Sequence, residues 1–538
     1  MNNYIFYNIK KFKYKIIYKA LYNILISILG IMSILITKYI INYALDKDFN
    51  NLKVSIIIFI GMTAITLILS PINSYISTVF KFKIFDDIQS NLYKKAINSK
   101  LEKINKHSSL DIVNRINADC GTFISFIYDI IPTIIGLILT IILSVFILIN
   151  INYIFLLIIL IFSISTTIFS KMLNKKQREL YIKIQNNDVD NRITMDESLK
   201  NIEYIKVSEL EEKNINYINK LYSNRMYLNK KMSVIIGIIS FFFSLGSVVS
   251  YTIVFLVGVY QLFTGVLEIA EFTVLLQIYR QLNSSILELQ SYIPNFNNVL
   301  AAIDRICEIE DLESEDINNN KISEFKNKIE FKDISFEYKD NKIINNLSFS
   351  IKKGDILGII GESGSGKTTF LKLMASLLTV KSGKILIDNI DLSNNHRSLI
   401  SYVPQDDMLF TKSIKDNLLY HNSCVSNSEL NKVLYLTKID SFLDKLPQGI
   451  HTNIKNLSKG QRQRITLARA ILQKKPIILL DEVTAALDID TEHHIINSIK
   501  NLDYKPTCFI VTHRKSILNI CNKIYDIKTN TLMFRTLN

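Results

Sequence analysis

The stretch ILGIIGESGSGKTTF, residues 356–370, decides how the second half of this chain folds. Its first part, residues 356–360, is apolar and predicts a buried strand, and the residues after Lys367 predict a helix. The stretch fits the pattern G-x-x-x-x-G-K-[ST] in the strand–loop–helix context that the pattern requires. Backbone N–H groups of such a loop, together with the positive end of the following helix, bind phosphate groups. We therefore predict a nucleotide-binding site here.

The residues expected to bind the nucleotide form one continuous run: Gly361, Glu362, Ser363, Gly364, Ser365, Gly366, Lys367, Thr368 and Thr369. The glycines let the backbone approach the phosphate oxygens closely. Lys367 supplies a positive charge for the β- and γ-phosphates, and Thr368 offers a hydroxyl to Mg²⁺.

A second signal, formed by two acidic residues, comes about 120 residues later, in IILLDE at residues 477–482. Four aliphatic residues followed by two carboxylates predict a central strand that presents acids at its carboxyl end, where α/β sheets bind ligands. Asp481 is suited to holding the metal through water, and Glu482 to orienting or deprotonating an attacking water. Short apolar strands alternate with helices from Lys328 onward, which indicates an α/β domain.

Between these two signals lies LSKGQ at residues 457–461. It resembles the signature of the ATP-binding cassette (ABC) family, usually L-S-G-G-Q, and the chain is similar to an ABC exporter half-transporter over essentially its whole length. Lys459 replaces the first glycine of that signature. The resemblance implies that Ser458, Gly460 and Gln461 face a nucleotide bound by another cassette.

Other elements that resemble the family follow in order. The resemblance assigns Tyr338 to stacking on the adenine of ATP, and Gln405 to contacting Mg²⁺ and sensing the membrane domain. It assigns Ala485-Ala486-Leu487-Asp488 to the D-loop and His513 to the switch histidine. The expected catalytic residues are Glu482, His513 and Lys367, and the expected metal ligands are Thr368, Gln405 and Asp481. The stretch Thr452–Asn456 is shorter than in most exporters and lacks their Gly-Glu pair.

The first half of the chain carries long runs without charge, and crossing a bilayer takes roughly 20 apolar residues as a helix. Four such runs predict five spans, because the third is long enough for two spans that turn at residues 150–152: Ala20–Thr37, Val54–Phe80, Ile130–Ser170 and Ser233–Leu267. A sixth span, Phe272–Ile293, is interrupted by Arg280 and Glu288. Two readings of Arg280 stay open: contact with an anionic group on a solute, or a snorkelling or ion-paired arginine, for instance one paired with Glu288.

The basic residues concentrate ahead of the first span and in the loops at residues 81–129 and 171–232. An excess of Lys and Arg marks the cytoplasmic side, so both termini are expected in the cytoplasm of a multi-pass cell-membrane protein. This topology accounts for much of the net charge of +14, and no nucleic-acid partner is needed. The two loops predict helices that extend the spans, and residues 105–119 and 197–206 resemble the family's coupling segments. Five scattered Cys indicate reduced thiols rather than a disulfide framework.

We therefore expect an α-helical membrane domain of six spans followed by an α/β P-loop NTPase domain, the ABC cassette. The expected divisions are a transmembrane domain at residues 1–305, a linker at 306–327 and the cassette at 328–538.

The resemblance implies an ATP hydrolase, with ATP and Mg²⁺ as cofactors, that drives export of an amphipathic solute by alternating access. The solute classes left open are a peptide, a lipid and a drug-like molecule. The partners expected are membrane lipid and a second half-transporter, for which a homodimer suffices and a heterodimer stays open. Two other functions remain: an ATP-gated sensor without bulk transport and, more weakly, a nutrient importer.

Overall fold

The computed structural model describes residues 2–315, 324–338, 341–391, 396–422, 424–483 and 487–534. The chain forms two compact units. One comprises residues 1–94 and 109–310, and the other comprises residues 95–108 and 311–538. The segment 95–108, which we expected within the first cytoplasmic loop of the membrane domain, therefore belongs to the same unit as the cassette.

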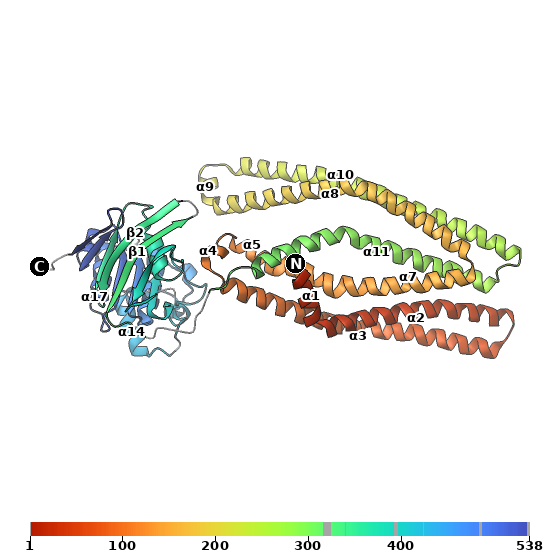
Figure 1. The fold of residues 1–538 in the computed structure, drawn as a ribbon, viewed down its shortest axis with the longest axis horizontal. Coiled ribbons are helices and arrows are strands. Elements are labelled where there is room, and N and C mark those ends of the chain that lie inside the picture. Colours follow the sequence, from red (N-terminus) through yellow and green to blue (C-terminus); the bar gives the residue numbers. More distant parts are fainter. Residues whose placement is uncertain are drawn as a thin grey trace. The chain divides into compact units, whose positions relative to one another are not determined.

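The first unit is helical throughout its described elements (Figure 1). These are α1 (Asn2–Lys11), α2 (Lys13–Leu45), α3 (Phe49–Ile97), α5 (Ser109–Asn114), η1 (Arg115–Asp119), α6 (Cys120–Ile124), η2 (Ser125–Ile130), α7 (Ile131–Ile151), α8 (Tyr153–Lys200), α9 (Ile202–Val207), α10 (Glu211–Phe263) and α11 (Ile269–Glu310). Helix α3 ends in the second unit, where α4 (Leu101–Ile104) follows it.

Four helical segments in the described part of the chain are long and apolar enough to cross a membrane, and a fifth apolar helix covers Tyr153–Thr166. The four are Lys13–Leu45, Phe49–Ile97, Ser109–Ile151 and Glu211–Phe263. Helix α11 is continuous from Ile269 to Glu310, so the charges in the predicted sixth span do not interrupt the helix. It also runs beyond residue 306, where we expected the linker to begin.

The turn predicted at residues 150–152 is present. Asn152 is extended between α7 and α8, and its side-chain oxygen accepts a hydrogen bond from the backbone N–H of Ile154. Its amide nitrogen donates to Gln261 of α10 at 3.1 Å. Asn is suited to this position because its side chain caps the first turn of a helix.

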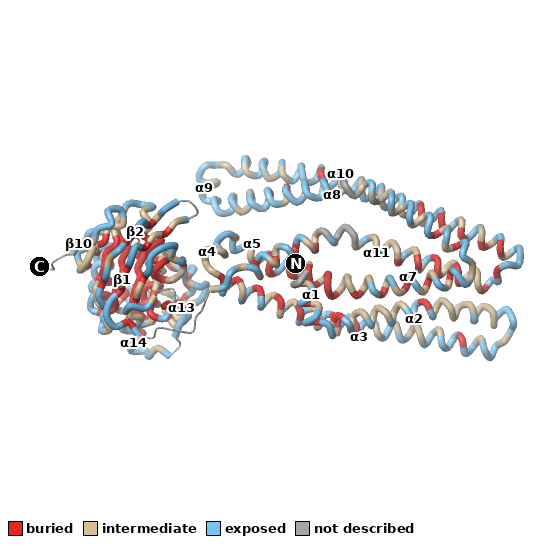
Figure 2. The backbone as a smooth tube through the Cα atoms, in the orientation of Figure 1, coloured by how far each residue is buried: buried red, intermediate tan, exposed pale blue. Residues whose placement is uncertain are grey.

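The two long loops are helical, as predicted. Helices α8 and α10 lie side by side and continue well past their apolar parts to α9, which joins them (Figure 1). Many residues of this unit are exposed (Figure 2). On the apolar parts of the helices, the exposed side chains include many large hydrophobic ones. Such a surface is typical of helices that lie in lipid.

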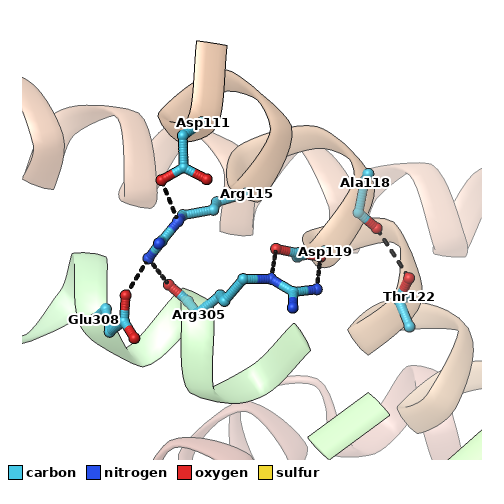
Figure 3. Close-up of polar contacts among 7 residues, drawn as sticks. All are labelled: Asp111, Arg115, Ala118, Asp119, Thr122, Arg305 and Glu308. Atoms are coloured by element: carbon cyan, nitrogen blue, oxygen red, sulfur yellow. Dashed lines mark hydrogen bonds and ion pairs between the residues drawn. The ribbon is translucent and has the colours of Figure 1, made fainter. Parts of the chain in front are cut away.

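Ion pairs join η1 to the C-terminal part of α11 (Figure 3). Arg115 is buried and contacts Asp111, Glu308 and the backbone oxygen of Arg305. Arg305 grips Asp119 with two nitrogens, at 2.7 and 2.6 Å. The π-helical geometry of η1 widens the helix at the residues that form this cluster.

The second unit contains two sheets. The strands are β1 (Lys328–Tyr338), β2 (Asn341–Lys352), β3 (Ile356–Ile360), β4 (Ser382–Ile387), β5 (Ile390–Asp391), β6 (Ile400–Val403), β7 (Ile477–Asp481), β8 (Thr507–Val511), β9 (Lys523–Asp526) and β10 (Thr531–Phe534). The antiparallel sheet has the order β2-β1-β4-β5, and the other has the order β10-β9-β3-β8-β7-β6. In the second sheet β3, β6, β7, β8 and β9 run parallel, so their carboxyl ends share one edge.

The remaining helices of this unit are α12 (Lys367–Met374), η3 (Arg397–Leu399), α13 (Ile414–Leu418), α14 (Asn427–Leu436), α15 (Asp440–Leu443), η4 (Gly449–His451), η5 (Ile454–Asn456), α16 (Lys459–Leu472), α17 (Ile489–Lys500) and α18 (Lys515–Leu518). An aromatic cluster ties both sheets to α12. Phe331 of β1 lies 5.2 Å from Phe370 of α12 and 6.2 Å from Phe509 of β8, measured between ring centroids. This packing holds α12 against both sheets.

The segment that follows α11 pairs with the end of α3 inside the second unit. The backbone N–H of Lys100 donates to Glu313, and that of Glu315 donates to Asn98, at 2.9 and 2.8 Å. The Glu315 carboxylate accepts hydrogen bonds from both terminal nitrogens of Arg397, a residue of the cassette. These contacts explain why residues 95–108 belong to this unit.

Candidate functional site

The predicted phosphate-binding loop connects β3 to α12 and has an open backbone conformation. Gly361, Gly364 and Gly366 have φ values of 153°, 82° and 98°, which favour glycine over residues with a side chain. A Cβ on Gly366 would lie 2.7 Å from the Ile343 side chain. The ammonium group of Lys367 donates to the backbone oxygens of Gly361 and Glu362, each at 2.8 Å. The lysine is thus folded back over the loop, where a phosphate would meet it.

Asp481 ends β7 beside this loop and is 1 % exposed. Both of its carboxylate oxygens are buried and lack a hydrogen-bond partner within the described residues. The hydroxyls of Thr368 and Tyr402 are neighbours that fall short of hydrogen-bond geometry. Burial raises the pKa of the Asp481 carboxyl, and the charge of Glu482 adds to the shift. An orphaned buried carboxylate next to a threonine hydroxyl fits a hard cation such as Mg²⁺.

Glu482 follows Asp481 and has a positive φ of 49°. Its backbone N–H donates to Val511 at the end of β8. Its carboxylate accepts a hydrogen bond from the Gln405 amide at 2.9 Å, and His513 Nε2 lies 3.7 Å from its other oxygen. Gln405, Glu482 and His513 follow the adjacent strands β6, β7 and β8, so the parallel sheet gathers three residues that are distant in sequence.

Tyr338 ends β1 in the antiparallel sheet and is 43 % exposed. Its ring packs edge-on against Phe336 at 4.9 Å between centroids. The hairpin that carries it also carries Ile343, the neighbour of Gly366. An exposed aromatic near the phosphate loop can stack on a base.

Ser458, Gly460 and Gln461 form the start of α16. The Ser458 hydroxyl accepts from the Gln461 N–H, and the Gln461 side-chain oxygen accepts from the Ser458 N–H at 2.8 Å. The Gln461 side chain therefore caps its own helix. In the described part of the chain, no hydrogen bond or ion pair joins residues 458–461 to the loop 361–369. One copy of the cassette thus brings Glu482 close to Gln405 and His513 but, within the described residues, joins none of them to the signature by a hydrogen bond or ion pair.

Two features of the site were missed from the sequence. Arg462, next to the signature, forms an ion pair with Asp407, and Arg469 donates to the backbone oxygen of Met408 at 2.7 Å. These contacts tie the signature helix to the segment after Gln405. The second feature is Tyr402, whose hydroxyl lies near Asp481. Its position before Gln405, on a strand adjacent to β7, was the available signal.

Of the predicted D-loop, Ala485 and Ala486 lie outside the described residues. Leu487 is buried, and the Asp488 carboxylate caps α17 by accepting from Thr491 at 2.8 Å. The stretch Thr452–Asn456 pairs with the segment at Ser413, and Ile414 donates to the Thr452 oxygen at 3.0 Å.

Two family models match the chain. The model of the ABC transporter transmembrane region matches residues 16–286, and the model described as ABC transporter matches residues 344–485. A putative export ATP-binding/permease protein of Rickettsia bellii is 30% identical over 499 residues, which cover 88% of this chain and 84% of that protein. ABC transporter B family member 1 of Dictyostelium discoideum is 26% identical over 501 residues, covering 90% of this chain but only 55% of that protein's length.

Among solved structures, a bacterial Atm1-family ABC exporter with ATP bound has a TM-score of 0.83 at 19% identity, covering 94% of both chains. At this identity the likeness shows a shared fold. The family matches agree with this fold and with the loop, acids and signature described above. The chain therefore belongs to the ABC transporter family, with a helical membrane region and an ATP-binding cassette joined in one polypeptide.

Proposed function

We propose that two copies of this chain form an ATP-driven exporter that moves an amphipathic solute out of the cytoplasm. The observation that carries this proposal is the division of the ATP site. One chain gathers Lys367, Asp481 and Glu482 at one sheet edge, but among its described residues no hydrogen bond or ion pair joins the signature to them. The site becomes complete when Ser458 and Gly460 of a second copy cover the bound nucleotide.

Within each site, Lys367 and the loop N–H groups would bind the β- and γ-phosphates of ATP. Thr368, Gln405 and Asp481 would hold Mg²⁺, which when bound would neutralise charge developing on the phosphate oxygens. The buried Asp481 carboxylate would then gain the positive partner that it lacks in the described residues. Tyr338 would stack on the adenine, because its ring is exposed on the hairpin that packs on the loop.

Glu482 would act as the general base. The Gln405 amide holds one carboxylate oxygen, which leaves the other able to accept a proton from water. The water oxygen attacks the γ-phosphorus while the bond to the β–γ bridging oxygen breaks, releasing ADP and phosphate. His513, close to the same carboxylate, would hydrogen-bond the γ-phosphate and align it.

Coupling to the membrane helices would use the two segments identified from the sequence. Just before the first, residues 105–119, the Glu102 carboxylate of α4 accepts from the Thr379 N–H of the cassette at 3.2 Å. In the second, the tip around α9 exposes Leu199, Tyr204 and Val207, of which Val207 is 86 % exposed. Such apolar side chains outside the lipid-facing region suit docking on the cassette of the second copy. The excess of Lys and Arg in these loops favours a cytoplasmic location for them and for both termini.

The divided site is testable by mixing two inactive variants. Lys367→Ala removes the phosphate contact, and Ser458→Arg blocks the signature, so each alone should be inactive. In a mixed dimer both lesions fall on one site and leave the other intact. Half of randomly assembled dimers are mixed, so co-expression should restore up to about a quarter of wild-type ATPase activity. Restoration by mixing would support the two-copy site, and a mixture as inactive as its parents would contradict it.

Export itself is tested in proteoliposomes with external cassettes. Uptake of a labelled lipophilic dye should require ATP and should be lost in Glu482→Gln, while nucleotide binding by that variant persists. ATP hydrolysis without uptake of any amphipathic probe would contradict the export proposal.

A further inference from the structure

Helix α11 has a polar exposed face within its predicted membrane-spanning part. Arg280, Ser284, Glu288 and Ser291 are all exposed, and their spacing places them on one side of the helix. The opposite side packs against the other helices of the unit, with Val274, Ile278, Leu282 and Ser285 at most 2 % exposed. The exposed face of α11 is therefore polar and its packed face apolar, whereas a helix that faces lipid is expected to expose apolar side chains.

The neighbouring helix α10 provides an internal comparison. Its exposed positions at the same level carry no charge: beside Ser244 and Thr252 they include the apolar Leu245, Val248 and Leu256, which are 45 %, 65 % and 61 % exposed. Those side chains match a lipid environment. Because the polar face of α11 does not, it fits a water-filled cavity rather than lipid.

The depth of Arg280 follows from its contacts with α10. Its guanidinium donates to the Tyr251 hydroxyl at 3.1 Å and lies 5.0 Å from the centre of that ring. Asn283, one turn further along α11, donates to Ser247 at 2.7 Å. Tyr251 and Ser247 are near the middle of the uncharged run 233–267. Arg280 therefore lies far from both ends of that span.

Neither charge of this face is neutralised within the described part of the chain. Arg280 has no carboxylate partner there, and the predicted ion pair with Glu288 is absent: Glu288 instead accepts from the Tyr292 hydroxyl at 3.3 Å. Eight residues separate Arg280 from Glu288, which corresponds to a rise of about 12 Å along the helix. That is too far for a direct ion pair, and it leaves one cationic and one anionic position on the same face.

From this geometry we propose that the polar face of α11 lines the solute path, and that Arg280 and Glu288 select a zwitterionic solute, a short apolar peptide with free termini. The inference rests on the proposed export function. An extended peptide advances by roughly 3.3–3.6 Å per residue, so three or four residues span the two charges. A zwitterionic lipid headgroup carries its two charges much closer together, which favours the peptide.

Four forms of one peptide test this selection: tetraleucine with free termini, with an acetylated amine, with an amidated carboxyl, and with both ends blocked. ATP-dependent uptake into proteoliposomes is measured for each. The wild-type protein should prefer the free form to the doubly blocked form by about tenfold, the change that 1.4 kcal/mol produces. Arg280→Ala should remove the preference for a free carboxylate, and Glu288→Gln the preference for a free amine.

Uptake of the doubly blocked peptide is the internal control, since neither variant should change it. Arg280→Lys should retain most of the preference for the free peptide. The double variant with Arg280→Glu and Glu288→Arg should prefer the free peptide more strongly than either single variant does. These results would separate a charge effect from a loss of structure. Unchanged selectivity in Arg280→Ala would overturn the proposal. Uptake of a lipophilic dye with none of the four peptides, or of a zwitterionic lipid in their place, would overturn the peptide assignment while leaving export intact.

Water access to the face is tested without a solute. Ser284→Cys should react with a membrane-impermeant thiol reagent, whereas Val248→Cys on α10 should not. The unsubstituted protein gives the background from its own exposed Cys424. Equal protection of both introduced cysteines would contradict a solute path along α11.

Discussion

The membrane unit and the cassette use apolar residues in opposite ways. In the cassette, large side chains such as Phe331, Phe370 and Phe509 are at most 2 % exposed and fill the space between the two sheets. In the membrane unit, side chains of similar size, such as Phe146 and Leu256, are more than 60 % exposed. Burial of these groups away from water drives folding of the cassette. In the spans, such groups remain in contact with lipid, so helix packing there must gain specificity from polar contacts. Buried apolar side chains therefore dominate the packing of the cassette, whereas the membrane unit combines an apolar cluster around Val274 and Ile278 with polar pairs such as Arg305–Asp119.

Truncation of an apolar side chain should separate the two units most strongly. Phe509→Ala removes a ring that is fully buried among aromatic neighbours, and such a change costs about 3–5 kcal/mol. Leu256→Ala, at an exposed position of α10, should leave thermal unfolding in detergent nearly unchanged. Similar losses at both positions would show that the exposed face of α10 is packed against protein.

Lys367→Ala should reduce ATPase activity by about 10²-fold or more, because the phosphates lose their direct positive partner. The fold of the membrane unit should not change. Lys384→Ala, an exposed lysine of β4, is the matched control and should retain full activity. A Lys367→Ala protein that hydrolyses ATP at the wild-type rate would contradict the assignment of the loop.

The polar contacts of the membrane unit are tested at Arg305. Arg305→Ala leaves Asp119, whose side chain is only 13 % exposed, without its two hydrogen bonds. Because Arg305 itself is partly exposed, the expected loss of stability is roughly 1–2 kcal/mol. Thermal unfolding in detergent measures it, with the exposed Arg192→Ala as control. Exchanging the two charges should recover part of the loss, and no recovery would indicate that shape rather than charge holds η1 to α11.

Asp481→Asn should raise stability while abolishing metal-dependent hydrolysis. The pKa of this carboxyl is raised by burial, so its charged form costs folding free energy at neutral pH. Wild-type stability should therefore increase as the pH falls through the raised pKa, because protonation removes the buried charge. The Asn variant should be more stable by about 1–2 kcal/mol at pH 7 without metal, and the difference should shrink toward low pH. Thermal unfolding between pH 5 and 8, without Mg²⁺, measures it. A difference that grows at low pH would contradict a buried, unpaired carboxylate.

Much of the cassette could be predicted because its chemistry is local in sequence. The loop 361–369 must follow a strand and open a helix, and both elements are present. The roles inside the site were harder to foresee. The Gln461 side chain is occupied in capping its own helix, and the ion pair of Arg462 with Asp407 joins residues 55 positions apart. The first contact has a local signal, since Ser458 and Gln461 fit the S/T-x-x-E/Q capping box, whereas the ion pair leaves none.

The two-part plan of this protein follows from local sequence, since uncharged runs long enough to span lipid and a phosphate loop between strand and helix are read from neighbouring residues. Tertiary structure alone decided the contacts between distant segments. It placed residues 95–108 with the cassette, gave Arg280 a tyrosine partner in place of Glu288, and set Glu482 between Gln405 and His513. The physical reason is that such contacts depend on the register and direction of packed elements, which local residue preferences do not specify.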